Sequence, residues 1–327
     1  MLGLKWRSCF IGCVAGLLLF GATFVQAQAY PNRPLRMIVP QGAGGGTDIL
    51  ARFVAQRLSE GFGQQVVIDN RGGAGGNIAA DLVAKSPPDG YTLYFGVTSS
   101  LAVNPHLFAK LSFDPQKDFV PVGMVTLMPL FLAVPVTQPI MSVKDLVAVA
   151  KAKPAGLSYG SSGVGGTTHL AMELFKSTAG VNIVHVPYKG TAAAVADMLA
   201  GNIQVMFDAY ATTAPHVKTG KLRFLAVGSA KRSSLAPDLP TLAESGFPGF
   251  DASFWCVIVA PTGTPKEVIA KLNGELNKVM ALPDLRERLA SLAMEPLSGT
   301  PEQAAAFIRS ESVKWAKVVK DSGAKAE

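Results

Sequence analysis

The sequence predicts an α/β protein in which strands alternate with helices. Three features recur along the chain: a short apolar run, a glycine-rich loop directly after it, and then apolar residues at helical spacing. Because a strand followed by a crossover helix returns to the sheet as a parallel neighbour, we expect parallel sheets with helices on their faces.

The first part of the chain contains this unit twice, followed by a third strand. The helix after the first glycine loop is indicated by Leu50, Val54 and Leu58, and Gly61 and Gly63 are expected to end it. A turn at residues 87–90 precedes the third strand. The expected strands are residues 35–39, 66–68 and 91–95, with glycine loops at 42–46 and 72–76 and a second helix around 78–83.

The middle of the chain restarts the pattern, and the tail is helical. Expected strands lie at residues 130–134, 157–159, 183–186, 205–207 and 222–227. The expected helices are residues 143–150, 170–175, 195–199, 268–276, 285–292 and 304–319.

Composition excludes several classes of protein. Apolar residues make 49% of the 327-residue chain and charged residues only 16%, whereas a disordered chain needs low hydrophobicity and high net charge. Thirty-three glycines occur without a Gly-X-Y period, which excludes collagen. The length favours two domains, each large enough to bury a core.

The first 29 residues have the layout of a secretory signal peptide. Lys5 and Arg7 precede an apolar stretch at residues 10–25, and Ala27-Gln28-Ala29 offers a small-x-small cleavage site. The alternative, an uncleaved anchor, is disfavoured because no charged residue flanks the end of the stretch. We therefore expect cleavage after Ala29 or Ala27, export to the periplasm, and no other membrane span.

Export would leave a chain with a single cysteine and a small positive charge. Cys256 alone cannot form an internal disulfide, and its place in an apolar run favours packing over nucleophilic chemistry. Loss of Lys5 and Arg7 lowers the formal charge from +7 to +5. The remaining charges are scattered, so a nucleic-acid partner is not expected.

Two of the glycine loops resemble each other. Residues 45–51 (GGTDILA) match residues 165–171 (GGTTHLA), and each segment follows a strand and opens a helix. The first amides of a helix lack intrahelical partners and carry partial positive charge, and glycines let a ligand approach them. Each half of the chain therefore holds a candidate anion site at the carboxyl end of a strand.

The kind of anion follows from what the loops lack. No Lys follows the glycines as in a nucleotide phosphate loop, because Asp48 comes after Thr47. Neither glycine loop of the first part has the third glycine of a dinucleotide fingerprint, and the loop around Ser162 is one residue short of a nucleophile elbow. The absence of these motifs favours a small carboxylate ligand over a cofactor.

Several polar residues near the loops have two interpretations. Asp48 fits a helix N-cap better than a ligand contact, whereas Asp208 is equally compatible with a ligand amino or hydroxyl group and with a neighbouring loop. The four histidines lack paired metal-ligand spacing, so no metal site is expected. Among them, His169 is placed to touch a ligand, and His185 fits a bonded histidine in a strand.

Ordered motifs along residues 30–327 resemble the substrate-binding proteins of tripartite tricarboxylate transporters, the Bug (TctC) family of periplasmic receptors. The motifs are Tyr30-Pro31 with Pro34-Leu35, Ile38-Val39-Pro40, Gly44-Gly45-x-Thr47-Asp48, Asn70-Arg71, Gly73-Ala74-Gly75-Gly76, Pro88-Asp89-Gly90-Tyr91-Thr92-Leu93, Asn104-Pro105, residues 185–190 (HVPYKG), residues 220–223 (GKLR), Ala260-Pro261 and Gly263-Thr264-Pro265.

The resemblance implies a type II periplasmic-binding-protein fold, in which two α/β lobes joined by a two-crossover hinge close on a ligand. It implies lobes at residues 30–128 with 253–327, and at 129–252, with crossovers near Leu130 and Trp255. It also implies a carboxylate ligand, a large and a small membrane transporter subunit as partners, a monomer, and no cofactor. The implied ligand contacts are Gly45, Gly46, Thr47, Asp48, Thr98, Ser99, Ser100, Ser161, Ser162, Gly165, Thr167, Thr168, His169 and Asp208.

The sequence departs from the family pattern at Gln41, Ala43, Gly72 and Cys256. Gln41 stands where the family usually has an aromatic residue, so it would offer the ligand a hydrogen bond instead of a ring face. We expect a solute receptor without catalytic activity. A receptor that feeds a membrane sensor kinase and a secreted hydrolase using Ser162 are the alternatives.

Overall fold

The computed structural model describes residues 30–325 except Gly45 and Lys189. All the elements below lie in the compact unit Arg33–Glu327. The expected signal peptide at residues 1–29 lies outside the described residues.

Strands and helices alternate through most of this compact unit, as the sequence predicts. Its first part consists of β1 (Leu35–Val39), α2 (Gly46–Phe62), β2 (Val66–Asn70), a 3-10 turn (Ala74–Gly76), α3 (Asn77–Ala84), β3 (Thr92–Val97), a π-helical turn (Ser99–Val103), α4 (Asn104–Leu107) and β4 (Phe119–Pro135). The remainder consists of α5 (Val143–Ala152), β5 (Ser158–Ser161), α6 (Thr167–Ala179), β6 (Val184–Pro187), α7 (Thr191–Leu199), β7 (Met206–Ala209), α8 (Tyr210–Lys218), β8 (Leu222–Val227), β9 (Ser253–Pro261), α9 (Lys266–Ala281), α10 (Pro283–Ser291), β10 (Glu295–Pro296) and α11 (Pro301–Ser322).

The first three strands form the expected parallel sheet, with β1 between β2 and β3. Helices α2 and α3 make the two crossovers, and α2 buries Leu50, Val54 and Leu58, which the sequence places on one face. Since the three strands are parallel, the loops that follow them leave the sheet at the same edge.

The other strands correct the expectation of parallel sheets throughout. β9 is antiparallel to both β3 and β4, and β4 is antiparallel to β7, β8 and β10. β4 has 17 residues, of which the sequence predicts only 130–134, because Pro121, Gly123 and Pro129 interrupt the apolar pattern. Its register against β9 shifts between Pro121 and Gly123, where an irregularity absorbs the interruption.

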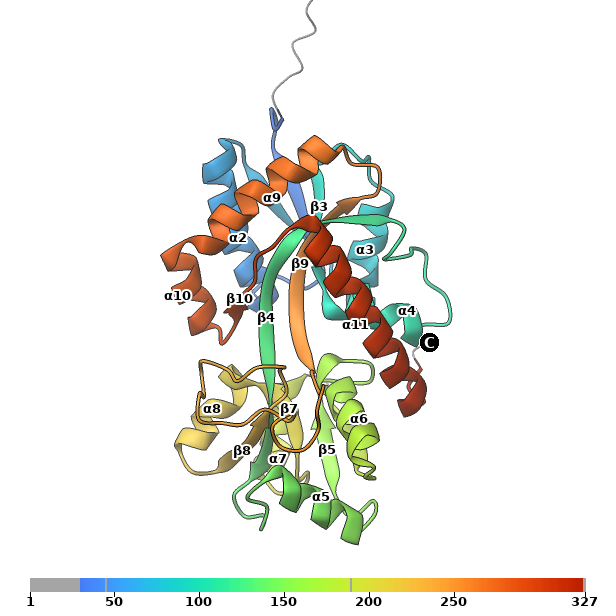
Figure 1. Ribbon diagram of the computed structural model, residues 1–327, viewed down its shortest axis with the longest axis vertical. Helices are drawn as coiled ribbons and strands as arrows, with labels where there is room; N and C mark the ends of the chain where they lie inside the picture. Colours follow the sequence, from blue (N-terminus) through green and yellow to red (C-terminus); the bar gives the residue numbers. More distant parts are fainter. Residues whose placement is uncertain (1–29, 45, 189, 326–327) are drawn as a thin grey trace, which may run out of the picture. The chain divides into compact units, whose positions relative to one another are not determined.

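β4 connects the first sheet to the second group of strands. Its residues 119–129 pair with β9, and its residues 130–135 pair with β7 and β8 (Figure 1). In the second group, β5 and β6 are parallel, and Tyr159 of β5 forms an isolated parallel bridge with Val205, next to β7. The loops after β5, β6 and β7 therefore also leave at one edge.

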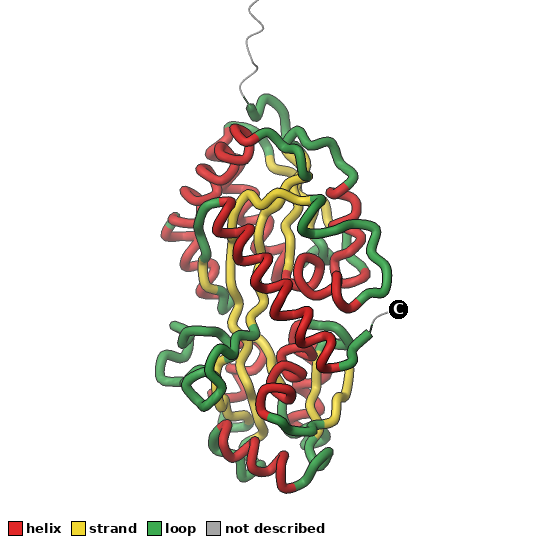
Figure 2. The backbone as a smooth tube through the Cα atoms, turned by 45° about the vertical axis from the view of Figure 1, so that its right-hand side comes forward, coloured by secondary structure: helices red, strands yellow, loops and turns green. Residues whose placement is uncertain are grey.

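The core runs along the strands, which lie between the helices in Figure 2. Helix α11 packs against the π-helical turn, β4 and α6. Its buried Glu311 accepts hydrogen bonds from the indole nitrogens of Trp255 and Trp315, at 2.8 and 3.1 Å. One carboxylate thus ties the C-terminal helix to β9.

Candidate functional site

The first glycine loop is held by a buried carboxylate. The side chain of Asp48 accepts hydrogen bonds from the Gly44 amide at 2.8 Å, the Arg52 guanidinium at 3.0 Å and the Asn70 amide at 2.8 Å. Asn70 also donates to the Gln41 carbonyl at 2.9 Å. Burial alone would raise the pKa of Asp48, but the bonds from Arg52, Gly44 and Asn70 lower it below its usual 3.8.

Asp48 is the third residue of α2, so the expected N-cap position is wrong. Its carboxylate reaches back to an amide before the helix, as the acidic residue of a capping box does. The first turn of α2 is thereby fixed, and Gly46 at its start is exposed to solvent.

The loops after β2 and β3 pack against the first loop. A Cβ on Gly76 would lie 3.1 Å from Pro40 and 3.1 Å from the Tyr94 hydroxyl, and its φ of 99° also favours glycine, so the residue suits this close approach. Ser99 donates a hydrogen bond to the Gly75 carbonyl at 2.8 Å. The three loops therefore form one surface at the carboxyl ends of the parallel strands.

The three hydroxyl residues that follow β3, Thr98, Ser99 and Ser100, differ in their exposure to solvent. Thr98 is buried, and its hydroxyl accepts the Trp255 amide at 2.8 Å and so joins β3 to β9. Ser100 is buried against Tyr94, with 2.6 Å between the hydroxyls. Ser99 is the partly exposed member of the three.

The second glycine loop, between β5 and α6, is also held from within. The Thr168 hydroxyl accepts the Ser162 amide at 2.9 Å and lies 3.1 Å from the Ser162 hydroxyl. The Gly165 amide donates to Nδ1 of His169 at 3.1 Å. Ser162 thus pairs with a threonine and not with an imidazole, which disfavours the nucleophile interpretation.

Asp208 lies at the starts of two helices in the second group. It is the next-to-last residue of β7 and has 2% of its surface exposed, and it accepts hydrogen bonds from the hydroxyls of Thr212 and Thr191 and from the Ala209 amide. Burial raises the pKa of Asp208 to about 6, although those three bonds oppose the rise. Its contacts therefore tie α7 to α8.

Replacement of Asp208 by asparagine is expected to change how stability depends on pH. A carboxyl whose pKa is raised on folding stabilises the protein while protonated and loses that contribution as pH rises from 3.8 through about 6. The stability of the wild type relative to Asp208→Asn should fall by about 2 kcal/mol between pH 4 and pH 8. Urea unfolding measures the difference. The exposed Asp238→Asn serves as control, and identical pH profiles for the wild type and Asp208→Asn would contradict the assignment.

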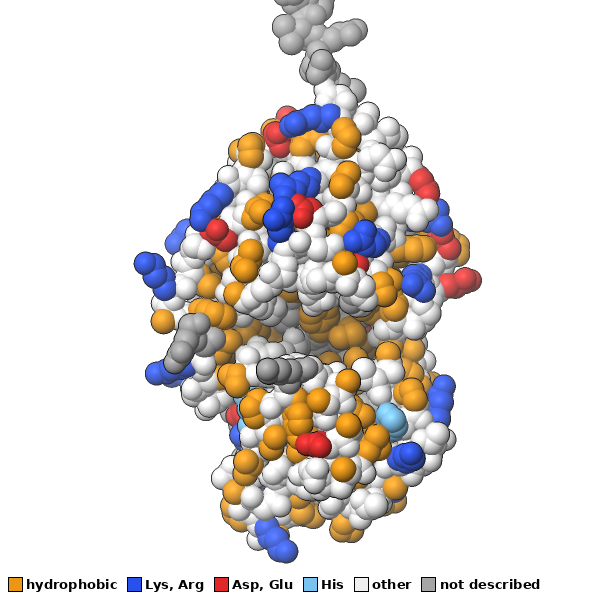
Figure 3. Space-filling model, turned by 180° about the vertical axis from the view of Figure 1, so that it is seen from behind, with side chains coloured by type: hydrophobic (Ala, Val, Ile, Leu, Met, Phe, Trp, Pro, Cys, Tyr) orange, Lys and Arg blue, Asp and Glu red, His pale blue; other side chains and the backbone are white. Residues whose placement is uncertain are grey.

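The structure brings the first part of the chain close to the second glycine loop. A Cβ on Gly165 would lie 2.4 Å from a methyl carbon of Leu107 on α4, so this side chain packs directly on the glycine. Figure 3 shows one face of the molecule, which is hollowed across its middle and has hydrophobic side chains inside the hollow.

The predicted site residues thus fall into two groups. Gln41, Gly46, Ser99, Ser162 and Thr167 are partly or fully exposed. The buried group consists of Thr47, Asp48, Thr98, Ser100, Ser161, Gly165, Thr168, His169 and Asp208, and Gly45 lies outside the described residues. Among the buried members, Asp48, Thr168 and His169 hold the two glycine loops in place through the hydrogen bonds above.

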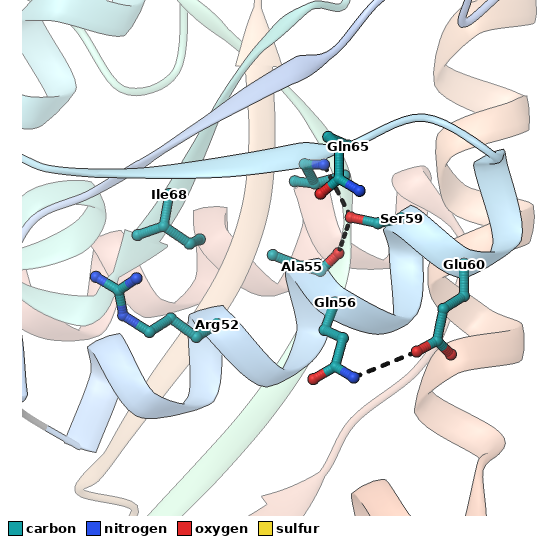
Figure 4. A pocket seen from close by; sticks show the side chains of 8 residues that line it. Arg52, Ala55, Gln56, Ser59, Glu60, Gln65 and Ile68 are labelled. Atoms are coloured by element: carbon teal, nitrogen blue, oxygen red, sulfur yellow. Dashed lines mark hydrogen bonds between the residues drawn. The ribbon is translucent and has the colours of Figure 1, made fainter.

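A separate pocket of about 490 Å³ lies between α2 and β2, and Figure 4 shows its lining. Its Ser59 hydroxyl bridges the Ala55 carbonyl and the Val66 amide, and Gln56 donates to Glu60. None of the predicted site residues lines it. The Ser59 hydroxyl thus joins α2 to β2, whereas the bond between Gln56 and Glu60 lies within α2.

Among residues 30–325, apart from the two undescribed positions, no cluster of His, Cys, Asp and Glu could hold a metal ion. Nor does any helix in that part of the chain have the length and apolar character to span a membrane.

Asn70, Arg52 and Asn104 also hold the loops, a role that the sequence alone does not predict. Asn104 is buried and donates to the Gly75 carbonyl and to the side chain of Asn77, at 3.3 and 2.6 Å. The sequence does single out both asparagines, because Asn70 and Asn104 belong to motifs that carry the family resemblance.

Glycine loops lie at the starts of α2 and α6, after β1 of the large sheet and β5 of the two-stranded sheet, in an α/β protein of the solute-binding class. The chain belongs to the tripartite tricarboxylate transporter family receptors, because the model of that family matches residues 50–324. The expected family and fold class are thus confirmed.

Individual relatives agree with this assignment. The Bordetella pertussis protein BugT is 39% identical over 302 residues, which cover 92% of this chain and 93% of BugT. A solved structure described as R. palustris Rpa4515 with adipate is 40% identical, with a TM-score of 0.77 and 90% and 98% of the two chains covered. MatC from Rhodopseudomonas palustris with bound malate is 31% identical, with a TM-score of 0.74 and coverage of 89% and 100%.

Proposed function

We propose that this protein captures a small organic carboxylate in the periplasm and delivers it to the membrane subunits of a tripartite transporter. The observation that carries the proposal is the pair of glycine loops at the starts of α2 and α6, each braced by side chains behind it. Helix starts attract anions, and a preorganised loop loses little entropy on binding. The adipate and malate named with two relatives support a carboxylate ligand.

The proposed lobes are residues 30–128 with 253–327, and residues 129–252, with β4 and β9 near the crossovers. A ligand that touches Gly46 in one lobe and Ser162 or Thr167 in the other would favour closure, because it binds the closed state more tightly than the open one. Gln41 would add a polar contact from the first lobe.

Export would follow cleavage after residue 29 or 27, and the partners would be a large and a small transporter subunit. The receptor would act as a monomer without catalytic activity. Its alternative role is to report the same ligand to a membrane sensor kinase.

Titration calorimetry with adipate, malate, citrate, acidic amino acids and an aromatic acid tests the proposal. Binding of one of these acids with 1:1 stoichiometry is expected. Absence of binding across the whole panel would refute the carboxylate assignment.

The variant Thr47→Pro is expected to bind the same acid at least tenfold more weakly, since it removes one amide donor from the α2 start. Proline is tolerated in the first helical turn, so the fold should survive. Glu267→Pro places proline at the same position of α9, away from both loops, and should leave affinity unchanged. Unchanged affinity in Thr47→Pro would show that the first loop does not hold the ligand.

A further inference from the structure

Three aromatic rings stack directly beneath the second glycine loop. The ring of His185 in β6 lies nearly parallel to those of Tyr159 in β5 and His169 in α6, with centroids 4.7 and 4.1 Å away and interplanar angles of 16° and 21°. The centroids of Tyr159 and His169 are themselves 6.3 Å apart. Tyr159 and His169 are both buried. The parallel pairing of β5 with β6, which sets Tyr159 opposite His185, creates the stack.

Each imidazole holds one end of the loop. His169 accepts the Gly165 amide through Nδ1 at 3.1 Å. His185 bonds through Nε2 to the Ser161 hydroxyl at 2.7 Å, and that hydroxyl also accepts the Gly163 amide at 3.1 Å. The two histidines therefore fix the start and the end of the turn that leads into α6.

The bond to Gly165 requires a neutral His169. A ring nitrogen that accepts an amide proton carries a lone pair, so the ring proton of His169 resides on Nε2. Protonation of Nδ1 would set two donors against each other and break the bond to the loop. Two imidazolium rings 4.1 Å apart would also repel each other.

The surroundings keep both rings uncharged. Burial lowers the pKa of His169, and burial together with His169 lowers the pKa of His185 to about 4. Glu173 would favour the charged rings, but its carboxylate already accepts the Tyr159 hydroxyl at 2.5 Å and the Lys176 ammonium at 2.7 Å.

Charged groups on the neighbouring elements are engaged elsewhere. Helix α6 packs against β7 and α11. On those elements, Asp208 accepts from Thr212, and Asp321 pairs with Lys317 and accepts from Ser177. Lys176, on α6 itself, adds a positive charge that opposes protonation of the pair.

We propose that His169 and His185, as a neutral stacked pair, are positioning residues that set the second glycine loop in its ligand-binding conformation. The inference rests on the proposed function and deepens it: the sequence resemblance makes His169 a ligand contact, whereas its bond to Gly165 makes it a support behind the loop. Ligand affinity would then depend on the hydrogen-bond acceptor at Nδ1 and not on an imidazole as such.

Two substitutions of His169, by side chains of nearly equal size to each other, separate these roles. In His169→Asn the side-chain oxygen can still accept the Gly165 amide, whereas His169→Leu offers no acceptor. We expect His169→Asn to bind adipate within about threefold of wild type at pH 7.5, and His169→Leu to bind at least tenfold more weakly. His216→Leu on α8 is the control. Equal losses in the Asn and Leu variants, or none in the Leu variant, would overturn the proposal.

Nitrogen-15 NMR of the ligand-free protein tests the pair without any ligand. We expect His169 to be protonated on Nε2 and not on Nδ1, both rings to be mostly neutral at the usual histidine pKa of 6.5, and the Gly165 amide resonance to move in His169→Leu but less in His169→Asn. A ring that is mostly charged at pH 6.5, or a Gly165 resonance equally displaced in both variants, would contradict the assignment. If the wild type binds no acid at all, the proposed function fails, and the NMR result still decides whether the pair sets the loop.

Discussion

Asp48→Ala should unfold at markedly lower urea concentration than the wild type and should bind its acid at least tenfold more weakly. The substitution leaves the Gly44 amide, Arg52 and Asn70 without their shared acceptor. Hydrogen bonds to a buried charged group are among the stronger ones, so we expect a loss of about 2–4 kcal/mol in the free energy of unfolding. Urea titration and calorimetry measure the two effects.

Glu60→Ala is the matched control for this variant, because Glu60 lies on the same helix and pairs with Arg57 at the surface. It should change stability by less than about 1 kcal/mol. The Asp48 contribution is present above pH 3.8 and lost as pH falls through the lowered pKa, so the two proteins should converge in acid. A constant difference down to pH 2 would show that packing, and not the carboxylate, accounts for the loss.

Gly165→Val is expected to destabilise the protein by about 3–5 kcal/mol and to abolish measurable binding. Gly165 has a φ of 76°, which a β-branched residue rarely adopts, and its new Cβ would press on Leu107. Gly180 has a similar φ of 62°, but a Cβ at this position would meet no atom within 4 Å. Gly180→Val should therefore show only the backbone cost, about 1–2 kcal/mol.

A double-mutant cycle isolates the contact between α4 and the second loop. Leu107→Ala removes the side chain that the new Cβ meets, so the double variant should recover about 1–2 kcal/mol relative to additivity. If the stability losses of Gly165→Val and Leu107→Ala simply add, the contact between Leu107 and the new Cβ does not account for the destabilisation.

The sequence predicts the local elements well because each depends on its own periodicity. Helix α2 and strands β1 and β3 are predicted by the spacing of their apolar residues and by the glycines that mark their ends. The length of β4 and its antiparallel partners could not be predicted, since Pro121 and Pro129 mask the strand and pairing is decided by distant residues. Helix α8 was missed for a similar reason, because Pro215 lies inside it.

The candidate site was located better than its residues were assigned. Both glycine loops were found from their repeated pattern, yet the partners of Asp48 in α2 include Asn70, which lies 22 residues away at the end of β2. Likewise, His169 and His185 meet only because β6 lies beside β5. Sequence spacing reveals which backbone can bind an anion, whereas the side chains that brace it become visible only after the strands have paired.

The shared carboxylate of Glu311 has a spectroscopic consequence. If residues 1–29 are removed on export, Trp255 and Trp315 are the only tryptophans left in the chain, and both donate to that oxygen. Nearly all the ultraviolet emission of the mature protein would then come from one spot where strand and terminal helix join. A change in the polarity around either indole would therefore alter the tryptophan fluorescence of the protein.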